Sequence, residues 1–190
     1  MSELWASVGA YVGCAVLLTA GVMHLRDPRA FAAVLARQLG RSGGIVQPVA
    51  VVVIAAEVGF GLAGLGLGLL DTSGTPVLYP LYGAAGLYGV FALYGAALLR
   101  WQPAAPCGCS HTDHPVNVWI PVRAGVLGVG VLYAATAPAD VLAWSATAEF
   151  FLTAVASAAL AVLAWNLPTA LAVDAPAPTE PFPGEPSWTS

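Results

Sequence analysis

Lysine is absent from this 190-residue sequence, and all six basic residues are arginines. Charged residues make up only 8% of the chain, whereas roughly 25% is usual in soluble domains. The few arginines form no long basic run, so the sequence lacks the electrostatic footprint of a nucleic-acid-binding protein. So little charge also excludes an ordinary soluble domain, whose surface is rich in charged side chains.

The sequence is rich in apolar residues. They make up 58% of the chain, and the mean hydropathy is +0.79. Several apolar runs approach or exceed the roughly 18 to 20 residues that cross a bilayer as a helix. The sequence therefore predicts an all-α fold, a polytopic transmembrane helical bundle. The five predicted spans are 5–25, 46–70, 76–99, 117–136 and 141–167. Four spans are the alternative, because the segment 117–136 is short and contains Pro121 and Arg123.

A short amphipathic helix is predicted after the first span. Asp27 and Pro28 are suited to the cap and the first position of a helix. Such a helix would lie at the membrane interface. The apolar residues that fall on its one face are Phe31, Val34, Leu35 and Leu39.

The chain divides into a transmembrane domain, residues 1–168, and a tail, residues 169–190. The tail is rich in proline and acidic residues and lacks apolar periodicity, which predicts disorder. Small residues are dense in 59–68 and 83–97, where they would let helices approach closely. We expect this packing to lie within one bundle, with a homodimer face as the alternative.

The arginines predict the orientation. Arg26, Arg29, Arg37 and Arg41 lie in the first connection, and Arg100 closes the third span. Because connections rich in arginine stay inside, both connections that follow these spans should be cytoplasmic, with the amino terminus outside. The number of spans alone places the first connection and residues 106–115 on the same side of the membrane.

Residues 106–115, PCGCSHTDHP, concentrate the reactive side chains of the chain. Cys107 and Cys109 are separated only by Gly108, whose backbone freedom would permit a tight disulfide. Strained disulfides exchange readily, which favours a redox role. The alternatives are an inert loop and a metal site. The metal ligands would be Cys107, Cys109, His111 and His114, although their spacing is unusual for structural zinc.

Ionisable side chains inside membrane spans usually face a partner or a cavity. Glu57 and Arg123 lie at depths from which their side chains could meet, and His24 ends the first span at the same face. We predict a Glu57–Arg123 pair that supports the cysteines, with a purely charge-neutralising pair as the alternative. For His24 the alternative is an interaction with the last carbonyls of its helix. Cys14 is expected to be a small packing residue.

Three stretches carry a resemblance to a known family. They are AGVMHLRDPRAF (20–31), PVAVVVIAAEVGFGL (48–62) and CGCSHTDHPVNVWIPVRAGVL (107–127). The pattern resembles the MauE family of methylamine-utilisation membrane proteins, relatives of the DoxX group, over roughly residues 5–165. Its more specific features are the Cys-Gly-Cys motif at 107–109, Arg123 in the next span and Glu57 in the second span. The family commonly has Phe-Gly after the motif, whereas this chain has Ser110 and His111.

The resemblance implies thiol-disulfide chemistry, or maturation of a partner such as the disulfide-rich subunit of methylamine dehydrogenase. It also implies a thioredoxin-like protein as a partner. We therefore predict a membrane thiol-disulfide carrier or maturation factor with Cys107 and Cys109 as the reacting pair. Glu57, Arg123 and His24 support that pair. If the protein is an enzyme, we expect it to be a thiol-disulfide oxidoreductase. The sequence indicates no cofactor. Binding or transport of copper, zinc or mercury is the alternative.

One conflict concerns the partner, which is exported in the methylamine system, whereas the arginines place the cysteines in the cytoplasm. Either the protein carries electrons across the membrane or its orientation is inverted.

Overall fold

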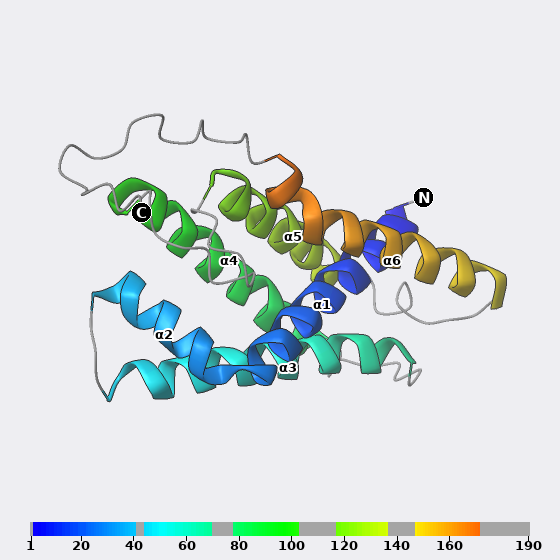
Figure 1. Cartoon of the computed structure of the whole chain (residues 1–190). Coiled ribbons are helices and arrows are strands. Elements are labelled where there is room, and N and C mark those ends of the chain that lie inside the picture. Colours follow the sequence, from blue (N-terminus) through cyan, green and yellow to red (C-terminus); the bar gives the residue numbers. More distant parts are fainter. Residues whose placement is uncertain (1, 41–43, 70–77, 103–116, 137–146, 172–190) are drawn as a thin grey trace, which may run out of the picture.

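The computed structural model describes residues 2–40, 44–69, 78–102, 117–136 and 147–171, which are all helical apart from short turns and ends (Figure 1). Five helices are long and apolar enough to cross a membrane. The prediction of a five-span helical bundle is therefore confirmed, and the four-span alternative is wrong. The helices are α1 (Ser2–Arg26), α2 (Pro28–Leu39), α3 (Val46–Leu69), α4 (Leu78–Trp101), α5 (Trp119–Thr136) and α6 (Thr147–Ala170).

The short helix α2 begins and ends where its sequence predicts. Oδ1 of Asp27 accepts a hydrogen bond from the backbone N–H of Ala30 at 2.9 Å, and Pro28 occupies the first turn. Gly40 ends the helix in the left-handed conformation, with φ of 60°. The helix does more than lie against lipid, because Leu35 is buried against the bundle.

Helix α1 is the centre of the bundle. It contacts all four other spans and is the most deeply buried of the five. Helix α4 packs mainly against α5. Helices α3 and α4 diverge toward the end at which α2 lies (Figure 1). Helix α2 lies between the diverging ends of α3 and α4 (Figure 1).

Close helix packing explains part of the small-residue pattern. A Cβ atom on Gly61 of α3 would lie 2.8 Å from the backbone nitrogen of Leu18 on α1, so glycine is required there. Cys14 is fully buried between these helices, which confirms its expected packing role. A Cβ atom on Gly89 of α4, in contrast, would meet no neighbouring helix within 4 Å among the described residues. A homodimer face on α4 stays a prediction.

The chain direction gathers five helix ends at the end of the bundle near α2. These are the carboxyl ends of α1, α4 and α6 and the amino ends of α3 and α5 (Figure 1). The side-chain amide of Asn117, just before α5, donates to the carbonyl of Pro168 on α6 at 2.9 Å. Gln102 and Asn117, which flank residues 103–116, therefore lie at this end. Residues 172–190 of the predicted tail lie outside the described residues.

Candidate functional site

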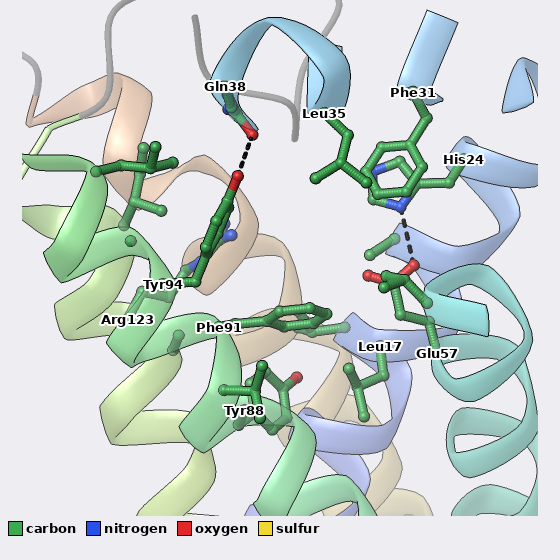
Figure 2. A pocket seen from close by; sticks show the side chains of 18 of the residues that line it. Leu17, His24, Phe31, Leu35, Gln38, Glu57, Tyr88, Phe91, Tyr94 and Arg123 are labelled. Atoms are coloured by element: carbon green, nitrogen blue, oxygen red, sulfur yellow. Dashed lines mark hydrogen bonds and ion pairs between the residues drawn. The ribbon is translucent and has the colours of Figure 1, made fainter. Parts of the chain in front are cut away.

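A cavity of about 300 Å³ lies beneath α2, between α1, α3, α4 and α5 (Figure 2). That volume is at the lower end of the range for small-molecule sites. Most of the lining is aliphatic or aromatic, and the polar side chains are few. The polar lining residues are His24, Gln38, Glu57, Tyr88, Tyr94 and Arg123.

On one side of the cavity, His24 and Glu57 form a hydrogen-bonded pair. Nδ1 of His24 lies 2.8 Å from Oε2 of Glu57, and only 11% and 3% of the two side chains are exposed. The imidazole also stacks on Phe31 of α2, with ring centroids 4.0 Å apart. A carboxyl group and an imidazole in direct contact can hold a proton between them, which makes this pair suited to proton transfer.

The approach of α3 to α1 brings this pair together. Gly21 lies one turn before His24, and a Cβ atom there would lie 2.9 Å from the backbone nitrogen of Val58 and 3.0 Å from Cβ of Glu57. The missing side chain at Gly21 lets the two backbones come close. Glu57, in the middle of α3, therefore reaches the last turn of α1.

Arg123 enters the cavity from α5 and binds α6. Its Nη1 donates to the carbonyl oxygens of Ala164 and Trp165, both at 3.3 Å, and its guanidinium lies 5.9 Å from the centroid of the Trp165 ring. Pro168 explains the hydrogen bond from Arg123 to the carbonyl oxygen of Ala164. Because proline has no N–H, the carbonyl four residues earlier, that of Ala164, loses its helical partner. Arg123 supplies the missing donor.

The direct Glu57–Arg123 pair predicted from span depth is therefore wrong. Glu57 pairs with His24, and the hydrogen bonds of Arg123 go to α6. The two side chains nevertheless line the same cavity, together with His24. His24 bonds to Glu57 and so does more than contact the last carbonyls of α1, while its supporting role toward the cysteines stays a prediction. The prediction did not consider that Pro168 leaves the Ala164 carbonyl free to accept a hydrogen bond from Arg123.

Two tyrosines of α4 were missed by the sequence analysis. Tyr94 donates through its hydroxyl to Oε1 of Gln38 at 3.0 Å, which ties α4 to α2, and Tyr88 donates to the carbonyl of Gly13 at 2.7 Å. Gln38 carries a sequence signal, because it lies seven residues after Phe31 and so shares the apolar face of α2. A polar residue on that face indicates a polar partner inside the bundle.

Cys107, Cys109, His111 and His114 lie outside the described residues. Within the described ranges, no group of three or more histidine, cysteine, aspartate or glutamate side chains could hold a metal ion. The predicted redox pair and the alternative metal ligands both stay predictions. The chain enters and leaves residues 103–116 at Gln102 and Asn117, at the end of the bundle that carries the cavity.

Comparison with known proteins identifies the family. A family model described as methylamine utilisation protein MauE matches residues 1–137, which include α1 to α5, the His24–Glu57 pair, Arg123 and both cysteines of the motif. No curated protein and no solved structure matches the chain. Because the family model covers well over half of the sequence and five apolar helices can cross a membrane, the chain is a multi-pass membrane protein that belongs to the MauE family.

Proposed function

We propose that this protein is a membrane thiol-disulfide carrier or maturation factor in which Cys107 and Cys109 cycle between dithiol and disulfide. The observation that carries the proposal is the position of α4 and α5. The ends of these helices that flank the cysteine motif lie at the end of the bundle where His24, Glu57 and Arg123 line one cavity. Family membership supports a membrane role in methylamine utilisation.

The chemistry needs one thiolate and one resolving thiol. A thiolate of the partner attacks one sulfur of the Cys107–Cys109 disulfide and forms a mixed disulfide, and the partner's second thiol then displaces the chain. The chain's disulfide is reduced to a dithiol, and the partner's dithiol is oxidised to a disulfide. Arg123 begins the second turn of the helix that follows the motif, and its permanent positive charge favours the thiolate.

A thioredoxin-like protein is the proposed exchange partner, and maturation of a disulfide-rich enzyme subunit is the proposed outcome. Two cysteines separated by one glycine close a very small ring, which stabilises a fold little. A role in exchange therefore explains the motif better than a structural crosslink does. The bilayer surrounds the five spans, and the cysteines would act at its surface.

Alkylation of the purified full-length protein across a series of glutathione redox buffers tests the proposal. Mass spectrometry should show Cys107 and Cys109 losing reactivity together as the buffer becomes more oxidising. Cys14 is fully buried and serves as an internal control that should stay unlabelled in the folded protein. If both motif cysteines stay fully reactive under oxidising conditions and form no mixed disulfide, the redox proposal is wrong.

The same preparation distinguishes the metal alternative. Elemental analysis would find stoichiometric copper, zinc or mercury if the motif were a soft-metal site. If that metal is lost when His111 and His114 are replaced by alanine, the protein binds or transports a metal ion, and the redox proposal is wrong.

A further inference from the structure

Part of the cavity wall is exposed on helices that can cross a membrane. Two of its lining residues, Val49 of α3 and Val90 of α4, are 38% and 60% exposed on the outside of the bundle. Both belong to helices that can cross a membrane. These two helices, α3 and α4, diverge toward the end of the bundle at which α2 lies (Figure 1). A ligand can therefore enter sideways from the bilayer, which favours a lipid-soluble molecule.

The polar groups lie on opposite sides of the apolar space. His24 and Glu57 lie on the side of α1 and α3, Arg123 lies on the other side behind Tyr94, and the Phe91 ring lies between them (Figure 2). A ligand that satisfies both sides needs a flat apolar body with a polar atom at each end.

Both sides retain hydrogen-bonding capacity. A guanidinium has five N–H donors, and the two bonds of Arg123 to α6 both start from Nη1. Nε and Nη2 have no acceptor among the residues that the structure describes. On the opposite side, only Oε2 of Glu57 bonds to His24, so a carboxyl oxygen is left to face the cavity (Figure 2).

We infer that this cavity binds the ring of a lipid-soluble quinone. One quinone carbonyl would accept a hydrogen bond from Arg123, and the opposite carbonyl would face the His24–Glu57 pair. The apolar tail would leave between α3 and α4. A fatty acid or a phospholipid fits less well, because its polar atoms lie at one end only and would leave either Arg123 or the His24–Glu57 pair without a ligand partner.

This inference deepens the proposed function, and its redox step rests on that function. The dithiol becomes a disulfide as two S–H bonds break and one S–S bond forms. The two electrons and two protons pass to the quinone, whose two carbonyl oxygens become the hydroxyls of a quinol. The His24–Glu57 pair can deliver a proton to the nearer oxygen and regain one from the thiols. The quinone is thus the oxidant that regenerates the disulfide.

Binding can be measured separately from the redox step. The full-length protein in lipid nanodiscs is titrated with decylubiquinone. Val53 lines the cavity, and the neighbouring Val52 is 66% exposed on the outer surface. Val53→Trp fills the cavity and should weaken binding by more than about tenfold. Val52→Trp adds the same side chain outside and should leave binding unchanged.

A second pair of variants tests the polar contact. Arg123→Gln should weaken decylubiquinone binding by about tenfold, because a hydrogen bond from a charged donor is lost. Arg100→Gln removes an exposed arginine that does not line the cavity and should have no effect. Thermal unfolding of each variant shows whether it is folded. Photolabelling of the unmutated protein with an azidoquinone keeps the inference testable if a cavity variant fails to fold.

Azidoquinone labels on the cavity-lining parts of α1, α3 and α4 are the expected result. Scattered labels over the lipid-facing surface, or equal binding by Val53→Trp and Val52→Trp, would overturn the inference. A phospholipid retained in the cavity without any quinone binding would overturn it as well. Quinone binding without oxidation of Cys107 and Cys109 would support the site and contradict the proposed function. Disulfide exchange with a protein partner without quinone binding would support the proposed function and contradict the quinone site.

Discussion

Nδ1 of His24 and Oε2 of Glu57 lie 2.8 Å apart, in side chains that are almost completely shielded from solvent. The contact joins the last turn of α1 to the middle of α3. In a low-dielectric interior, each group depends on the other to offset the loss of water. This pair, rather than a pair of Glu57 and Arg123, is the central electrostatic contact of the bundle.

A double-mutant cycle should detect this dependence. His24→Phe leaves the Glu57 carboxyl without its partner, at an expected cost of about 3 to 5 kcal/mol in the free energy of unfolding. Adding Glu57→Leu should recover much of that loss, because no unpaired group then remains. Unfolding of the purified protein in detergent measures the four free energies. Purely additive losses would show that the two side chains are not energetically coupled.

Glu57 and Arg123 provide the matched control cycle. Their side chains have different hydrogen-bond partners, so Glu57→Gln and Arg123→Met should interact only through the shared cavity, with a smaller interaction energy than in the His24–Glu57 cycle. Strong recovery in that double variant would instead restore the direct pair that the span depths predicted.

Pro168 determines how much Arg123 contributes to stability. Arg123→Met removes the donor to the Ala164 carbonyl, and leaving this partly buried acceptor unpaired should cost about 1 kcal/mol, the lower end of the range for buried groups. In a Pro168→Ala background the N–H of residue 168 can bond to that carbonyl, so the same Arg123→Met change should cost less. Unfolding free energies and hydrogen exchange at the end of α6 measure the difference. An equal cost in both backgrounds would show that the carbonyl freed by proline is not what Arg123 satisfies.

The close approach of α1 and α3 predicts opposite effects for two glycines. Gly61→Ala would force a Cβ atom against the Leu18 backbone and should destabilise the protein by about 1 to 3 kcal/mol. Gly59→Ala faces open space and should be neutral or stabilising by up to about 1 kcal/mol, because alanine favours helix. Thermal unfolding of the two variants tests the pair. Equal tolerance at both positions would contradict this helix packing.

Much of the fold follows from local sequence features. The apolar runs predict the five spans because each helix satisfies its own backbone hydrogen bonds in lipid. Asp27, Pro28 and Gly40 act within one turn of α2, so its limits can be inferred from neighbouring residues alone. Such features need no knowledge of how the helices pack.

The partners inside the site depend on packing and could not be predicted in the same way. Depth along a span indicated that Glu57 and Arg123 lie toward one end, but it says nothing about the order of helices around α1 or the rotation of each helix. His24 reaches Glu57 because α1 and α3 are neighbours, and Arg123 reaches Ala164 because α6 lies near α5. Only Gln38, on the apolar face of α2, and Pro168, four residues after Ala164, carried local signals that the sequence analysis missed.

Orientation is a separate prediction from the positions of the arginines. An impermeant thiol reagent added to intact cells should leave Cys107 and Cys109 unlabelled, because the connections that carry or follow the arginines should stay inside. Cys14 is buried in either orientation. Permeabilised cells provide the positive control. Labelling in intact cells would invert the orientation and remove the conflict with an exported partner.

Disulfide transfer to a thioredoxin provides the decisive test of the thiol-disulfide cycle. The oxidised full-length protein is mixed with reduced thioredoxin, and free thiols on both proteins are quantified by alkylation and mass spectrometry over time. We predict that each disulfide formed in thioredoxin is matched by two new thiols, at Cys107 and Cys109. Cys14→Ser should leave the transfer intact, and Cys107→Ser should abolish it. If thioredoxin stays reduced while the chain remains folded, or if transfer persists without Cys107, the proposed cycle is contradicted.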